Sequence, residues 1–147
     1  VIDPINYRVQ HALKNGAEHV FKSVDDFVQY KNGSGVDLVF EATNSPEGLN
    51  LSINASNIGG KIIVVGIPDG DSYQFKASEA RRRGISIKFS RRMGEVYDRT
   101  ISMVDKGLVV LDDLATHTFP LKDGEKAFIN NLEYRDSVLK SIIFPNE

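Results

Sequence analysis

Strand-type and helix-type segments alternate along most of this chain, and this alternation limits the possible folds more than any other feature. The β-rich run VDLVFE occupies Val36–Glu41. A helix is expected over residues 45–60, because a proline suits its first turn and a glycine pair its end. The apolar run KIIVVG follows at residues 61–66, as is typical of a strand covered on both faces. This strand, helix, strand order predicts a parallel α/β sheet.

The same rhythm extends to both sides of this central segment. Ser23 and Asp26 form a plausible cap for a helix that continues to Tyr30. The other expected helices cover residues 4–15 and 78–83 and a segment that carries residues 97–108. We therefore predict a doubly wound, mostly parallel sheet with strands near Val1, Val20, Val36, Lys61 and Ile85.

The last part of the chain departs from this rhythm. From about His117, HTFPL indicates a short strand, KDGEKAFINN a short helix, and SVLKSIIFP a closing strand. No long linker separates this tail from the residues before it. We therefore predict two domains, a partial sheet domain over residues 1–115 and a return segment over residues 116–147.

Composition and charge exclude several classes of protein. The 147 residues are 41% hydrophobic and 26% charged, which is typical of a globular domain. The net charge of −2 and the lack of a long apolar run predict neither a nucleic-acid nor a membrane partner, so a cytoplasmic protein is expected. Cysteine is absent and the three histidines are widely separated, so no metal site is expected in this chain.

An acid close to the start of the chain has two interpretations. In dinucleotide-binding sheets, an acid at the end of the second strand binds the ribose, and a glycine-rich turn precedes it by about 20 residues. Asp3 has the position of that acid, but the turn is missing. The GSG of residues 33–35 leads into a strand and lacks a third glycine, so it is no substitute. Taken alone, Asp3 is better explained as a helix N-cap than as a ribose-binding acid.

Four segments together resemble a known family. They are DPINYRVQHALKNGAEHVF, GVDLVFEATNSPEGL, GGKIIVVGIP and THTFPLKDGEKAF. Their order and spacing resemble the C-terminal half of medium-chain dehydrogenases, the zinc-type alcohol and polyol (sorbitol-like) dehydrogenases. The resemblance covers nearly the whole chain. It implies a Rossmann-like sheet that lacks its first strand, which is expected between the strands at Val1 and Lys61, with the glycine loop upstream.

The resemblance also implies a cofactor and a set of residues that bind it. Asp3 corresponds to the ribose-binding acid, and Arg8 to the cation that follows it. A carboxylate at the ribose favours NAD over NADP, because it accepts from a free 2′-hydroxyl and repels a 2′-phosphate. The further positions expected to line NAD are Ala42, Thr43, Val65, Gly66, Ile67, Arg92 and Lys140.

These further positions have different expected roles. Ala42 and Thr43 correspond to the adenosine side of the site. Residues 65–67 correspond to a strand end near the nicotinamide, where Gly66 permits close approach. Arg92 corresponds to an arginine near cofactor and substrate, with Arg91 as the alternative after a one-residue slip. Lys140 corresponds to a cation near the pyrophosphate. A plain turn remains the alternative for the glycine, and solvated charges remain the alternative for the cations.

By this resemblance the chain is the cofactor-binding fragment of an NAD-dependent dehydrogenase that oxidises an alcohol or polyol. The zinc ligands and proton relay of the family lie outside it, so no catalytic residue is assigned and the chain alone is expected to be inactive. A homo-oligomer is expected, with edge strands near Phe75 and Phe89 as contact candidates. Two alternatives remain, a degenerate non-catalytic nucleotide-binding or oligomerisation module and another Rossmann-like enzyme such as a methyltransferase. The return tail argues against the methyltransferase.

Overall fold

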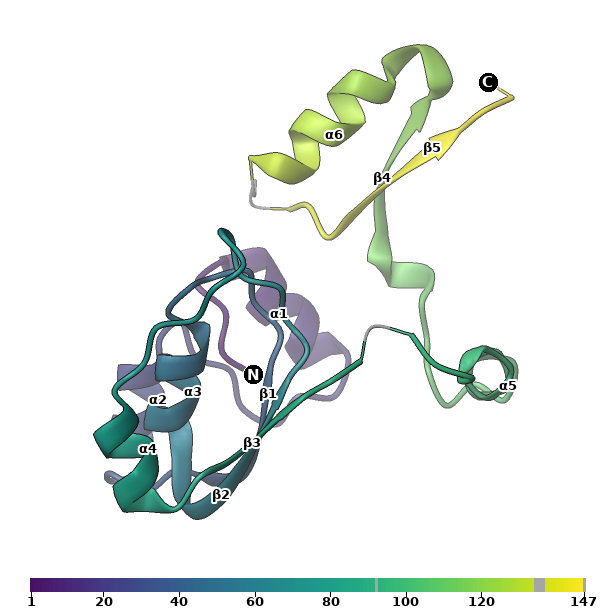
Figure 1. The fold of residues 1–147 in the computed structure, drawn as a ribbon. Coiled ribbons are helices and arrows are strands. Elements are labelled where there is room, and N and C mark those ends of the chain that lie inside the picture. The colour runs from purple at the N-terminus through teal and green to yellow at the C-terminus, as the bar shows by residue number, and fades with distance from the viewer. Residues whose placement is uncertain (92, 134–136, 147) are drawn as a thin grey trace. The chain divides into compact units, whose positions relative to one another are not determined.

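The computed structural model, drawn in Figure 1, describes residues 1–91, 93–133 and 137–146. These residues form two units, each with its own parallel sheet. The three-stranded unit contains Ile2 and residues 23–94. The two-stranded unit contains Val1, residues 3–22 and the described residues from 95 onward. No helix in the described part of the chain is both long and apolar enough to cross a membrane.

The sheet of the three-stranded unit has the order β1-β2-β3, and both of its pairings are parallel, as predicted. Its strands are β1 (Val36–Glu41), β2 (Ser56–Val64) and β3 (Ser86–Phe89). Since β2 pairs with β1 on one side and β3 on the other, no further strand can pair with it. The expectation that a missing strand adjoins Lys61 is therefore wrong. The edges open to another strand belong to β1 and β3.

Three helices cover one face of this sheet (Figure 1): α2 (Val24–Tyr30), α3 (Gly48–Ala55) and α4 (Ala77–Arg83). The core beneath them consists of Leu49, Ile53, Ile62, Val64 and Ala80. At the start of α2, the Ser23 hydroxyl accepts a hydrogen bond from the Asp26 amide at 3.1 Å, which confirms the predicted cap. Because the apolar side chains of α3, β2 and α4 pack against one another in one layer, these elements form the core of the unit.

The helix expected over residues 45–60 is shorter than predicted. It ends at Ala55, and β2 begins at the next residue. The glycine pair that suggested a helix end lies inside β2, where the register with β1 shifts between Val36 and Leu38. Gly59 there has φ +75°, a value that favours glycine. The pair therefore accommodates a strand irregularity, which is a common role of glycine in strands.

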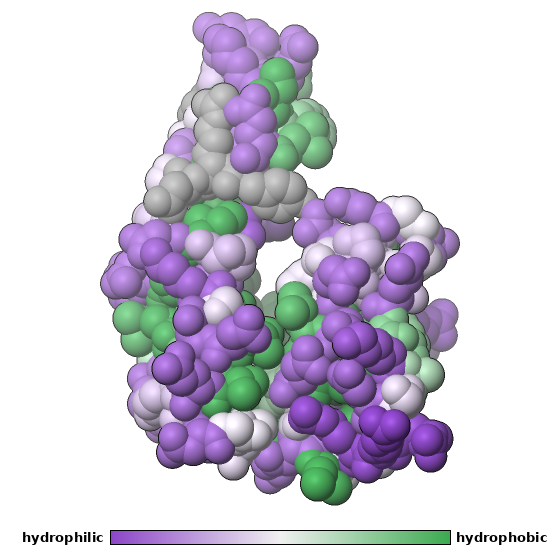
Figure 2. All heavy atoms as spheres, turned by 90° about the vertical axis from the view of Figure 1, so that its left-hand side faces the viewer, coloured by the Kyte–Doolittle hydropathy of each residue, from purple (hydrophilic) through white to green (hydrophobic). Residues whose placement is uncertain are grey.

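The opposite face of β1 carries exposed apolar side chains. Val39 and Glu41 point to the helix-covered side, whereas Leu38 is 48% exposed and Phe40 is 65% exposed. Figure 2 shows a different view, in which hydrophilic residues predominate and hydrophobic ones are exposed in separate patches. The apolar face of β1 thus remains available for packing.

The two-stranded unit contains the strand, helix, strand order predicted for the tail. Strands β4 (Ala115–Pro120) and β5 (Lys140–Phe144) pair in parallel, and α6 (Gly124–Leu132) connects them. The remaining elements of the unit are the helices α1 (Asn6–Lys14) and α5 (Tyr97–Asp105) and the short 3-10 helices η1 (Asp112–Leu114) and η2 (Leu121–Asp123). No residue of α5 is buried, although this helix has the amphipathic pattern.

Two predicted strands shrink to a single bridge. The Asp3 amide donates to the Phe21 carbonyl at 3.1 Å, and the Phe21 amide donates to the Val1 carbonyl at 2.9 Å. This is the hydrogen-bond pattern of one parallel pair, so the expectation of full strands near Val1 and Val20 is wrong in extent. The edge strand expected near Phe75 is also absent, because residues 73–76 form no regular structure.

The core position in β2 yields a stability prediction. Ile62 is fully buried, whereas Ile58 in the same strand is 84% exposed. Ile62→Ala should lower the free energy of unfolding by about 2–5 kcal/mol, since it removes buried methyl groups and leaves a cavity. Ile58→Ala, with the same chemical change, should alter it by no more than about 0.5 kcal/mol. Urea unfolding followed by circular dichroism measures both, and equal losses would contradict the described core.

Candidate functional site

The carboxyl ends of β1 and β2 carry adjacent loops. The Glu41 carbonyl accepts hydrogen bonds from the amides of Val65, at 2.7 Å, and Gly66, at 3.0 Å. The residues after each strand are therefore held side by side, at the edge where open parallel sheets bind ligands. Five predicted positions come together here, namely Ala42, Thr43, Val65, Gly66 and Ile67. We call these residues the sheet-edge site. All except Gly66 are exposed.

A buried acid lies directly beneath the sheet-edge site. The Glu41 side chain is 2% exposed, and it is the one buried charged side chain in the described ranges. Its Oε1 accepts from the Thr43 amide at 2.8 Å and from the Thr43 hydroxyl at 2.5 Å. Its Oε2 accepts from the Tyr73 hydroxyl at 2.9 Å, and that hydroxyl also lies 3.2 Å from the Gly66 carbonyl oxygen. Three donors thus satisfy a carboxylate that forms no ion pair with any described residue.

Two glycines make room for this carboxylate. A Cβ at Gly66 would overlap the Thr43 carbonyl oxygen and Glu41 Oε2, and a Cβ at Gly48 would overlap Glu41 Oε1 and the Thr43 hydroxyl. The close approach expected at Gly66 is therefore made in the structure by the protein's own backbone and acid. Its approach to a cofactor stays a prediction.

Sequence reasoning did not identify Glu41 or Tyr73 as part of this site. An acid at the end of an apolar run is easily taken for an exposed strand end. The available signal was strand alternation, which places residue 41 on the same face as Val39.

Burial raises the pKa of Tyr73 from 10.0 to about 12, and its hydrogen bond to Glu41 and the negative charge of that acid act in the same direction. Ionisation of the phenol would place a second anion beside the first, in a partly desolvated place. Tyr73 therefore stays a hydrogen-bond donor throughout the neutral pH range.

Asp3 and Arg8, both expected at the ribose, lie together in the two-stranded unit. Asp3 Oδ1 accepts from the Ile5 amide at 2.9 Å, and Asp3 Oδ2 lies 3.8 Å from Arg8 Nη1. Ile5 is the N-cap residue of α1 and no side chain caps this helix. Asp3 therefore closes a turn before α1, and the N-cap interpretation is wrong in detail. The ion pair is partly exposed and contributes little to stability.

The remaining predicted cations have less defined surroundings. Lys140 is the exposed first residue of β5, and its amide lies 3.4 Å from the Thr116 hydroxyl, which accepts from it. Arg91 is exposed and follows β3, whereas Arg92 lies outside the described residues. In the part of the chain that the structure describes, no three His, Asp or Glu side chains are grouped to hold a metal ion.

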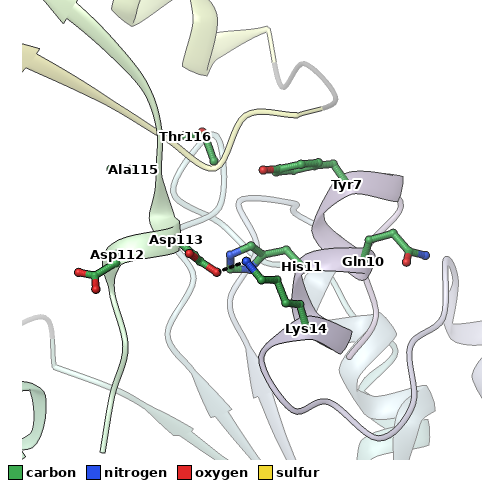
Figure 3. Close-up of a pocket in the computed structure, with 8 residues that line it drawn as sticks. All are labelled: Tyr7, Gln10, His11, Lys14, Asp112, Asp113, Ala115 and Thr116. Carbon is green, nitrogen blue, oxygen red and sulfur yellow. Dashed lines mark hydrogen bonds and ion pairs between the residues drawn. The ribbon is translucent and has the colours of Figure 1, made fainter. Parts of the chain in front are cut away.

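A pocket of about 420 Å³ in the two-stranded unit lies between α1 and the segment from η1 to β4 (Figure 3). Lys14 Nζ and Asp113 Oδ2 are 2.5 Å apart across it. This hydrogen bond and the opposite charges raise the pKa of Lys14 and lower that of Asp113. Both side chains are exposed. The lining residues are Tyr7, Gln10, His11, Lys14, Asp112, Asp113, Ala115 and Thr116, which include no predicted cofactor residue.

Comparison with known proteins agrees with this geometry. A family model described as zinc-binding dehydrogenase matches residues 1–106. Sorbitol dehydrogenase of Bacillus subtilis (strain 168) is 24% identical over 144 residues, which cover 95% of this chain and 41% of that protein. L-arabinitol 4-dehydrogenase of Hypocrea jecorina is 28% identical over 136 residues, with 90% and 35% covered. The chain thus spans about two-fifths of the length of these relatives.

A solved structure confirms the predicted fold class. The crystal structure of benzyl alcohol dehydrogenase from Acinetobacter calcoaceticus is 26% identical to this chain, with a TM-score of 0.79. The match covers 97% of this chain and 41% of that one. Together with the parallel sheets, it supports the predicted Rossmann-like α/β fold. The resemblance inferred from the four sequence segments is also confirmed.

The environment of Tyr73 predicts a pH dependence of stability. Since its pKa is raised from 10.0 to about 12, the folded state holds this proton where the unfolded chain loses it. The free energy of unfolding should therefore fall as the pH rises from about 10 to about 12. Tyr73→Phe should lack this component, so the stability difference between wild type and variant should shrink across that window. Urea unfolding at several alkaline pH values measures it, and a constant difference would contradict the assignment.

Proposed function

We propose, from the premise that this chain belongs to the zinc-binding dehydrogenase family, that it is the cofactor-binding portion of an NAD-dependent alcohol or polyol dehydrogenase. The observation that carries the proposal is the pairing of the two loops of the sheet-edge site through the Glu41 carbonyl. The names of two relatives, sorbitol and L-arabinitol 4-dehydrogenase, favour a polyol as substrate.

The described residues fit NAD at this edge. Val65 is 52% exposed and Ile67 is 60% exposed, and they flank a glycine, so a flat ring could pack on apolar side chains and backbone. In this proposal residues 65–67 bind the nicotinamide end, and Ala42 and Thr43 the adenosine side. When bound, NAD accepts a hydride from the alcohol carbon. The residues of this chain bind and orient it and exclude water.

The charged residues have separate roles in the proposal. Asp3 accepts from the ribose hydroxyls, and its charge selects NAD against NADP. Arg8, whose Nη1 lies 3.8 Å from Asp3 Oδ2, holds the Asp3 carboxylate. Arg92 supplies positive charge near the cofactor and the substrate, and Lys140 supplies it toward the pyrophosphate. Since the described residues offer no ligand set for zinc, we propose that any zinc of the complete enzyme is bound outside this chain.

We propose further that the complete protein is a cytoplasmic homo-oligomer with a domain boundary near residue 115. The open edge of β3 supports self-association, because its backbone groups can pair with another strand. Phe89 at the end of that strand is 64% exposed and offers an apolar contact.

Substitution of the proposed ribose-binding acid tests the cofactor preference. In the complete dehydrogenase, Asp3→Ala should weaken NAD binding by about 1–3 kcal/mol, or roughly fivefold to 150-fold in Kd, because it removes a charge-assisted hydrogen bond. Affinity for NADP should change much less. The control is Asp25→Ala, which removes an exposed acid from α2. Titration with both cofactors measures the effect, and equal losses would remove Asp3 from the ribose.

The 147 residues alone should bind NAD weakly and show no turnover. Their sequence contains no glycine-rich turn between a strand and a helix. In dinucleotide-binding sheets, the helix that follows such a turn binds the pyrophosphate at its N-terminus and contributes much of the cofactor affinity. Calorimetric titration with NAD and an alcohol oxidation assay with added zinc test the two halves of this prediction. Micromolar binding would show that an anion site has been overlooked. Metal-dependent turnover would show that this chain carries catalytic groups.

A further inference from the structure

Three segments of the three-stranded unit meet at one side chain. Strand pairing ends at Glu41 and Val64, so the loops beyond these residues are no longer held by the sheet ladder. The Glu41 carboxylate continues the connection, because it binds Thr43 in one loop and Tyr73 in the segment after the other. The same Tyr73 hydroxyl also lies 3.2 Å from the Gly66 carbonyl oxygen, so its one proton is shared between this oxygen and the carboxylate. One carboxylate thus links both loops of the sheet-edge site.

Core packing alone does not explain an acid at this place. Burial of a carboxylate is costly unless hydrogen bonds compensate, and an apolar side chain of similar size would avoid that cost. An apolar residue would, however, leave the Thr43 amide and the Tyr73 hydroxyl without this acceptor. The acid therefore stabilises the positions of Thr43 and Tyr73 and does not stabilise the apolar core.

The surroundings of Glu41 suit a carboxylate in which both oxygens accept hydrogen bonds. All three hydrogen bonds are donated to Glu41, and the two oxygens divide them between Thr43 and Tyr73. Gly48 and Gly66 leave the space that these oxygens occupy. A glutamine would present an amide N–H to one of the donors and would disturb that side of the arrangement.

We propose that Glu41 is a positioning residue of the cofactor site, whose buried carboxylate fixes the Thr43 loop against the Gly66 loop. This inference rests on the proposed function, since it assumes that NAD binds at the sheet-edge site. Glu41 itself does not touch the cofactor. It acts through the Thr43 backbone and hydroxyl and through Tyr73, whose single hydroxyl proton lies between Glu41 Oε2 and the Gly66 carbonyl oxygen.

The test compares Glu41→Gln and Tyr73→Phe with a control in the complete dehydrogenase. The control is Ser56→Ala, because Ser56 is fully buried and its hydroxyl donates to the Ser52 carbonyl at 2.8 Å, at the opposite end of β2. NAD affinity and unfolding free energy are measured for each protein. At similar losses of stability, Glu41→Gln should raise the Kd for NAD about tenfold, Tyr73→Phe severalfold, and Ser56→Ala hardly at all.

A spectroscopic measurement reads the carboxylate without any cofactor. The absorbance titration of the tyrosines, with Tyr73→Phe identifying the contribution of Tyr73, should show its pKa near 12 in the wild type. Glu41→Gln should lower that pKa, because the phenol loses an anionic acceptor. An unchanged titration would mean that Glu41 does not hold Tyr73 and would overturn the inference. If Glu41→Gln does not fold, Tyr73→Phe alone decides by its NAD affinity.

The outcomes separate this inference from the proposed function. If the wild-type protein binds NAD and Glu41→Gln binds it equally well, the positioning role is overturned and the proposed function stays intact. Wild-type protein that binds no NAD would overturn the proposed function and the inference with it. If the loss of NAD affinity is proportional to the loss of unfolding free energy in all three variants, the control included, Glu41 has only a structural role.

Discussion

The parallel pairing of β1 with β2 is the constraint on which the rest of the candidate site depends. It places Glu41 opposite Val64 and so starts two loops from the same level of the sheet. The Glu41 backbone then holds Val65 and Gly66, and its side chain holds Thr43 and Tyr73. The core beneath α3 and α4 keeps the two strands rigid, so the geometry of the loops follows from the register of the strands.

Local sequence signals predicted the elements whose ends are marked by their own residues. The run Val36–Glu41 forms β1 with the predicted bounds, and Ser23 caps α2. The strand order was not predictable in the same way, because it depends on which edges pair and no local pattern encodes that. The glycine pair in β2 was taken for a helix end, since glycine serves both helix ends and strand irregularities.

Only part of the candidate site was predicted from the sequence. Ala42, Thr43 and residues 65–67 were named by the family resemblance and not by a local pattern. They come together because residues that follow two adjacent parallel strands lie at one edge of the sheet. Glu41 escaped prediction because its role depends on donors from Thr43 and Tyr73, and Tyr73 lies 32 positions away in the sequence. Asp3 and Lys140 belong to the other unit, so their part in the site stays a proposal.

A crystal structure of the complete protein with NAD tests the central claim most directly, that the carboxyl ends of β1 and β2 form the cofactor site. The account predicts the nicotinamide against Gly66, the adenosine side near Thr43, and the Asp3 carboxylate accepting from the ribose hydroxyls. The Glu41 carboxylate should remain beneath, bonded to Thr43 and Tyr73. A cofactor bound away from this edge, or an Asp3 that still faces Arg8 with no ribose beside it, would contradict the account.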